Sequence, residues 1–129
     1  MSAKKILIVE DENSYYISIT NVLSNILGEI EIFNSSTPSN IASLIDEHDF
    51  DLVTLDYNLI DPYTDNEWKG TDLIPLLEKK RLLEKTIIIS NTYFIDNKEV
   101  KRVAAVISKN SFIYNTDAAK KVLEKTLVT

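Results

Sequence analysis

The sequence predicts an α/β domain in which helices cover both faces of one parallel β-sheet. Short apolar runs rich in β-branched residues alternate along the chain with segments whose apolar residues recur at helical spacing. Uninterrupted apolar runs are typical of strands buried on both faces, and parallel strands can only be joined by crossovers over a face of the sheet. The chain has 129 residues, so we expect a single domain over residues 1–129 with a core large enough to be stable by packing alone.

The apolar runs predict five strands. They cover residues 5–9, 29–33, 52–55, 86–90 and 104–108. The run at 29–33 alternates between polar and apolar residues more than the first run does. The runs at 5–9 and 52–55 are continuous, which is typical of central strands.

A helix is predicted after each strand. The expected helix starts, marked by polar caps or by proline in the first turn, are residues 10–13, Thr37-Pro38, Thr71 or Asp72, about Asp96 and about Thr116. Gly28 ends the first helix, because glycine is favoured just after a helix C-terminus. The polar segment between Asp56 and Gly70 is predicted as one unusually long loop.

Strict alternation with right-handed crossovers favours the strand order 2-1-3-4-5. This is a flavodoxin-like (βα)5 three-layer sandwich, in which ligands bind beyond the carboxyl ends of the strands. Four of the five strands end at chemically useful side chains, whereas the second strand, which this order places at an edge, does not. These side chains are Glu10 and Asp11, Asp56, Ser90 and Lys109.

Three carboxylates would meet beyond the carboxyl ends of the strands, those of Glu10, Asp11 and Asp56. Their mutual repulsion must be relieved by protons or by a cation, and oxygen ligands in a water-accessible site favour Mg²⁺. Lys109 adds a positive charge and Ser90 a hydrogen-bond donor. Such a set suits a phosphoryl group in transfer, with Asp56 attacking in line and becoming an acyl phosphate.

These residues resemble the receiver domain of bacterial two-component response regulators. The resemblance covers nearly the whole chain and depends on Glu10-Asp11, Asp56-Tyr57-Asn58-Leu59, Ser90 and Lys109 in that order. It implies that Asp56 accepts a phosphoryl group from a sensor histidine kinase or a histidine phosphotransfer protein. It also implies that Asp11, Asp56 and the Asn58 carbonyl bind Mg²⁺, with Glu10 acting through water. Ser90 and Lys109 would contact the phosphoryl group.

By the same resemblance the chain is a signalling switch and not an enzyme, apart from catalysing its own phosphotransfer and dephosphorylation. A degenerate receiver that only binds proteins is the alternative, favoured by Asn91, Val106, Asn110 and the long loop. A phosphoaspartate enzyme of the haloacid dehalogenase type is a third possibility. That family has an acid where this chain has Asn58, so a general acid is missing.

Several aromatic residues have two interpretations. Tyr93, Phe94, Phe112 and Tyr114 flank the last strand, where receivers bind targets or form dimers, although core packing explains them equally well. In the loop from Ile60 to Lys69, Tyr63 and Trp68 are expected to anchor the loop against the domain. The loop itself could cover the site or meet a partner.

Composition excludes several classes of function. The net charge of -6 and the absence of cysteine argue against direct nucleic-acid binding, disulfides and thiolate metal sites. The first apolar run is too short for a signal peptide or a membrane span. We therefore expect a cytoplasmic protein without a membrane partner.

Overall fold

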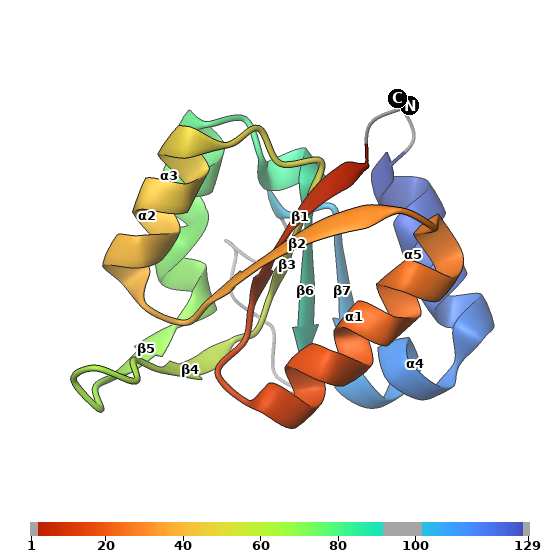
Figure 1. The fold of residues 1–129 in the computed structure, drawn as a ribbon, viewed down its shortest axis with the longest axis horizontal. Helices are drawn as coiled ribbons and strands as arrows, with labels where there is room; N and C mark the ends of the chain where they lie inside the picture. Colours follow the sequence, from red (N-terminus) through yellow and green to blue (C-terminus); the bar gives the residue numbers. More distant parts are fainter. Residues whose placement is uncertain (1–2, 92–101, 128–129) are drawn as a thin grey trace.

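The computed structural model describes residues 3–91 and 102–127. Its centre is a parallel sheet of five strands in the order β2-β1-β3-β6-β7, which confirms the predicted order (Figure 1). The strands are β1 (Lys4–Val9), β2 (Ile30–Ser35), β3 (Leu52–Leu55), β6 (Thr86–Ser90) and β7 (Ala105–Ser108). The edge strand β2 extends further than the sequence predicted, because Asn34 and Ser35 also pair with β1. The Asn34 side-chain amide adds a hydrogen bond to the carbonyl of Ile8 at 2.8 Å.

Helices cover both faces of this sheet, as predicted. They are α1 (Asn13–Leu27), α2 (Pro38–Glu47), α3 (Ile74–Lys79), α4 (Lys109–Tyr114) and α5 (Thr116–Leu127), with short 3₁₀ turns at Gly70–Leu73 and Leu83–Lys85. Figure 1 shows α2 and α3 on one face and α1, α4 and α5 on the other. The helix expected near Asp96 lies outside the described residues.

Helix α4 was not predicted. It has only six residues, too few for a helical period to emerge from the apolar pattern. Ser108 caps it, accepting a hydrogen bond from the Ser111 amide at 3.1 Å. The helix begins directly at Lys109, so the lysine at the end of β7 is fixed by a helical turn.

The sheet divides the core into two clusters. Alternate side chains of β1 point to opposite faces, so Ile6 and Ile8 belong to one cluster and Leu7 and Val9 to the other. All four side chains are at most 1% exposed. Burial on both faces explains why the central strands appear in the sequence as continuous apolar runs.

The segment after β3 is a β-hairpin, so the prediction of one long loop is wrong. Strands β4 (Asn58–Ile60) and β5 (Glu67–Lys69) pair in antiparallel register. Asp61 closes the turn between them, since its carboxylate accepts from the amide of Tyr63 at 2.9 Å. Three-residue strands with polar outward residues give almost no alternation signal in a sequence.

Trp68 anchors this hairpin to the domain, as expected, whereas Tyr63 does not. The Trp68 indole donates to the carbonyl of Ser36 at 3.0 Å, and its ring packs against the core cluster on the α2 and α3 face. A second contact joins the Thr37 hydroxyl to Asp61 at 3.3 Å. Tyr63 lies at the hairpin turn and is 85% exposed, so the anchoring prediction is wrong for this residue.

Within residues 3–91 and 102–127, no helix combines the length and the apolar character that crossing a membrane requires.

Candidate functional site

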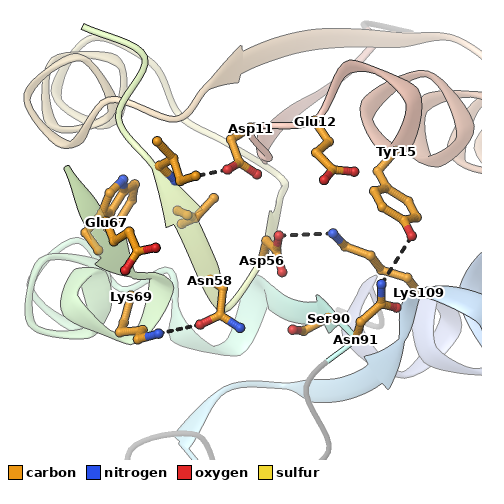
Figure 2. Close-up of a pocket in the computed structure, with 13 residues that line it drawn as sticks. Asp11, Glu12, Tyr15, Asp56, Asn58, Glu67, Lys69, Ser90, Asn91 and Lys109 are labelled. Atoms are coloured by element: carbon orange, nitrogen blue, oxygen red, sulfur yellow. Dashed lines mark hydrogen bonds and ion pairs between the residues drawn. The ribbon is translucent and has the colours of Figure 1, made fainter. Parts of the chain in front are cut away.

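Four predicted residues lie together at the carboxyl edge of the sheet. Glu10 follows β1, Asp56 follows β3, Ser90 ends β6 and Lys109 follows β7. None of the four is more than 5% exposed. Ionisable side chains are seldom buried this deeply unless they are paired. The structure therefore brings the predicted residues into one buried polar cluster, which Figure 2 shows around Asp56.

Lys109 is the cation at the centre of this cluster. Its ammonium lies 3.0 Å from Oδ2 of Asp56 and 3.2 Å from Oε2 of Glu10. On another side the ammonium sits 3.9 Å from the ring centroid of Tyr15 on α1. Two carboxylates and an aromatic face thus replace the water that the ammonium loses on burial.

Short hydrogen bonds hold the Asp56 carboxylate in place. Its Oδ1 accepts from the amide of Tyr57 at 2.7 Å, and the Ser90 hydroxyl also hydrogen-bonds to it. The backbone amide of Asp56 donates to the carbonyl of Val9 on β1 at 3.1 Å, which continues the pairing of β1 and β3. Asp56 therefore has little freedom in either its backbone or its side chain.

Burial is the largest influence on the protonation of this cluster. It raises the pKa of Glu10 to about 7, with the charge of Asp56 adding to the rise and Lys109 opposing it. Burial also raises the pKa of Asp56, although Lys109 limits the increase. For Lys109 burial acts to lower the pKa, but the charges of Asp56 and Glu10 outweigh it and the pKa is raised. One cation is thus shared by two buried carboxyl groups.

The donor set fits a divalent cation. Glu10, Asp11 and Asp56 each offer a carboxylate oxygen, and these oxygens all lie within 4.8 Å of one another. Oε2 of Glu10 is buried and accepts no hydrogen bond from any described residue, although the Lys109 ammonium lies near it. Hard oxygen ligands of this kind suit Mg²⁺.

Asn58 approaches the site differently from the acids. It begins β4 and lines the cavity that leads to Asp56. Its side-chain oxygen accepts a hydrogen bond from Lys69 on β5 (Figure 2). The predicted metal ligand is the backbone carbonyl of Asn58 and not this side-chain oxygen.

A cavity of about 390 Å³ gives access to Asp56. Its walls come from the ends of β3 and β6, the start of α1, and the β4–β5 hairpin. Asp11 joins two of these walls, because its Oδ2 accepts from the amide of Ile60 on β4 at 3.0 Å. The hairpin is thus an integral wall of the site.

Two residues beside the site were not identified from the sequence. The ring of Tyr15 on α1 covers Lys109, and its hydroxyl accepts from the Asn91 side-chain amide at 3.2 Å. These contacts join segments far apart in the chain, so no local pattern in the sequence indicates them. Lys69 was treated only as the end of a loop. No pattern in the sequence predicts the strand pairing that places it opposite Asn58.

The other residues singled out from the sequence do not belong to this polar cluster. Phe112 is fully buried in the core on the α1 and α5 face, so of its two interpretations the structure supports core packing. Tyr114 is 82% exposed and Val106 is 39% exposed, whereas Tyr93 and Phe94 lie outside the described residues.

Comparisons with solved structures identify the fold. A response regulator receiver domain protein (CheY-like) from Methanospirillum hungatei superposes with a TM-score of 0.74 at 26% identity, covering 97% of this chain and 94% of that one. The chain has the fold of a response regulator receiver domain. No protein-family model matches the chain, and no curated protein matches it.

Two further receiver structures contain bound ions. The response regulator TrrA from Thermotoga maritima, solved in complex with Mg²⁺ and BeF, has a TM-score of 0.73 at 21% identity, covering 96% of this chain and 99% of that one. The receiver domain of sensor histidine kinase PA1611 from Pseudomonas aeruginosa has a magnesium ion coordinated in its active-site cleft. It matches with a TM-score of 0.69 at 15% identity over 98% of both chains.

Proposed function

We propose that this receiver fold is a Mg²⁺-dependent signalling switch in which Asp56 accepts a phosphoryl group. The observation that carries the proposal is the placement of a buried carboxylate 3.0 Å from a buried ammonium, beside two further acids that can share a cation. A purely structural aspartate after a strand would need neither of these neighbours. The phosphoryl donor would be a sensor histidine kinase or a histidine phosphotransfer protein.

The reaction is an in-line displacement at phosphorus. An Asp56 carboxylate oxygen forms the new P–O bond while the P–N bond to the donor histidine breaks, and the bonding electrons and a proton remain with the departing imidazole. The product is an acyl phosphate on Asp56. The Lys109 ammonium then pairs with a phosphoryl oxygen, since it already lies within hydrogen-bond distance of the carboxylate that carries the group.

Ser90 and the acids complete the site. The Ser90 hydroxyl, which hydrogen-bonds to the free carboxylate, donates instead to a phosphoryl oxygen. Glu10, Asp11, Asp56 and the carbonyl of Asn58 would hold Mg²⁺, which supplies positive charge against the phosphoryl oxygens when bound. Burial of the cluster makes each of these electrostatic contacts stronger than it would be in water.

The experiment is intact mass spectrometry after incubation with phosphoramidate, with Mg²⁺ or with EDTA. We expect a single phosphoryl adduct on the unmodified chain with Mg²⁺ and none with EDTA. Asp56→Asn keeps the size of the side chain and removes the nucleophile, so it should carry no adduct. Asp117→Asn, in the exposed first turn of α5, is the matched control and should be modified normally.

An unmodified native chain under every condition would contradict the proposal. That outcome would leave the degenerate receiver, which binds proteins without phosphorylation, as the function to test next.

A further inference from the structure

The hairpin brings a second cation to the mouth of the Asp56 cavity. Lys69 on β5 pairs in register with Asn58 on β4, and both residues line the cavity. Figure 2 shows Lys69 and Lys109 on opposite sides of Asp56. Lys109 is buried in the floor of the site, whereas Lys69 is exposed on its outer wall.

The backbone next to Lys69 is in close contact with the backbone of Asp56. The next residue, Gly70, packs so closely on the Asp56 carbonyl that any Cβ there would overlap it. The Gly70 amide donates to the Tyr57 carbonyl at 2.7 Å, and the Lys69 amide donates to the Asp72 carboxylate at 3.1 Å. The backbone at residue 69 is therefore held by hydrogen bonds from its own amide and from the amide of Gly70, which joins it to the residue after Asp56.

No carboxylate of a described residue pairs with the Lys69 ammonium. Among residues 3–91 and 102–127, no acidic oxygen lies within the 4.0 Å ion-pair distance of its Nζ. It donates to the Asn58 side chain and lies 5.3 Å from the Tyr57 ring centroid. A neutral amide and an aromatic face orient the ammonium without neutralising it, so its charge remains available to an anion.

The other charged residues that line the cavity are mostly acidic, so a positive charge at Lys69 changes how it attracts an anion. Asp11, Glu12 and Glu67 line the cavity together with Asp56, while its other cation, Lys109, is already shared between two carboxyl groups. A phosphodonor is itself an anion, so it approaches a region of negative potential. A positive charge at the mouth offsets part of that repulsion.

We propose that Lys69 binds a phosphoryl oxygen of the incoming phosphodonor and positions the donor for attack by Asp56. The inference deepens the proposed function and depends on it. Lys69 makes and breaks no covalent bond, so the phosphoryl transfer from the donor histidine to Asp56 is unchanged. Its contribution is to the capture of the donor, in contrast to Lys109, which stabilises the group during transfer.

The test measures initial rates of Asp56 phosphorylation against phosphoramidate concentration, with Mg²⁺ present. Lys69→Gln removes the charge and keeps a donor to Asn58, and Lys69→Arg keeps the charge. Lys121→Gln, on the exposed face of α5, is the control for the loss of one positive charge elsewhere. Lys69→Met is a second neutral variant that retains the alkyl chain on Tyr57.

We expect both neutral variants to raise the half-saturating phosphoramidate concentration by about fivefold, the effect of one solvent-accessible ion pair, with the limiting rate unchanged. The native protein and the Lys69→Arg and Lys121→Gln variants should behave alike. Added KCl should weaken donor capture in the native protein and have less effect on Lys69→Gln.

Two results would overturn the inference while leaving the proposed function intact. One is that Lys69→Gln or Lys69→Met has the same half-saturating phosphoramidate concentration, with the same dependence on KCl, as Lys121→Gln. The other is an equal loss of limiting rate in Lys69→Gln and Lys69→Arg, which would mean that Lys69 only supports the hairpin. Absence of any adduct on the native chain is distinct from both, because it contradicts the proposed function and this inference with it.

Discussion

Gly70 packs against the backbone of Asp56, the residue at the centre of the site. A Cβ at position 70 would overlap the Asp56 carbonyl oxygen and lie 2.9 Å from Cγ of Leu55. Backbone on one side and a core side chain on the other leave no flexible group that could move aside. The requirement for glycine comes from this close approach, and it ties the end of the hairpin to the phosphoacceptor.

Substitution of Gly70 by alanine should therefore damage both stability and the site. We expect Gly70→Ala to lower the free energy of unfolding by about 3 kcal/mol, the upper range for forcing extra atoms into a packed region, and to weaken Mg²⁺ binding. Urea unfolding and Mg²⁺ titration measure the two effects.

Gly28→Ala is the matched control for this prediction. Gly28 has a φ of +82° and open space around its Cβ position, so alanine there is strained by about 1 kcal/mol without touching the site. Equal losses of Mg²⁺ affinity in the two variants would contradict the role assigned to Gly70.

The raised pKa of Glu10 makes the stability of the metal-free protein depend on pH. Burial moves this pKa from 4.5 to about 7 in the folded state, so between these values the folded protein holds a proton that the unfolded chain has released. Stability therefore falls as pH rises through this window, by at most about 3 kcal/mol, and the loss is complete above pH 7. Urea unfolding in EDTA at a series of pH values measures the slope.

Glu10→Gln mimics the protonated side chain and should flatten most of this slope. A residual decline from Asp56, whose pKa is also raised, should remain. An unchanged slope in Glu10→Gln would show that another group is responsible.

Tyr15 should act on Lys109 mainly through its ring. Tyr15→Leu removes the aromatic face 3.9 Å from the ammonium and should cost about 1 to 2 kcal/mol of stability, as expected for a cation held over a ring away from bulk water. Tyr15→Phe keeps the ring and loses only the hydrogen bond from Asn91, which should cost at most about 1 kcal/mol.

A double-mutant cycle with Asn91→Ala separates these two contributions. The losses in Tyr15→Phe and Asn91→Ala should not add in the combined variant, because both break the same hydrogen bond. Full additivity would mean that the contact contributes nothing in solution.

Trp68 should report on the anchoring of the hairpin. Trp68→Phe keeps an aromatic ring in the core but loses the bond to the Ser36 carbonyl, at a cost of about 1 kcal/mol. We also expect weaker Mg²⁺ binding, since Asp11 is held by the backbone of the same hairpin. Unfolding and Mg²⁺ titration of this variant, beside Tyr63→Phe at the exposed turn, provide the comparison. Mg²⁺ affinity equal to that of Tyr63→Phe would contradict the coupling.

The parts of the fold and site that could be predicted are those encoded locally. The continuous apolar run at Leu52–Leu55 marks a strand buried on both faces, and Asp56 follows it directly. Parallel topology then brings strand ends to one edge, which is why Glu10, Asp56, Ser90 and Lys109 could be grouped without a structure.

The parts that were missed depend on tertiary contacts or on very short elements. Strand β5 contains Glu67, Trp68 and Lys69, whose polar ends resemble a loop until β4 pairs with it. An exposed surface and core packing were equally good interpretations of Phe112 from the sequence, and only the short helix α4, which turns its ring into the core, decides between them. Neither pairing nor helix direction can be obtained from three to six residues of pattern.

Chemical trapping can show whether Asp56 is the residue that carries the phosphoryl group. Borohydride reduces an acyl phosphate on aspartate to homoserine, which peptide mass spectrometry can assign to one position. After incubation with phosphoramidate and Mg²⁺, we expect homoserine at position 56 and at no other acid. An unreduced Asp56 alongside homoserine elsewhere, for example at Asp11, would contradict it.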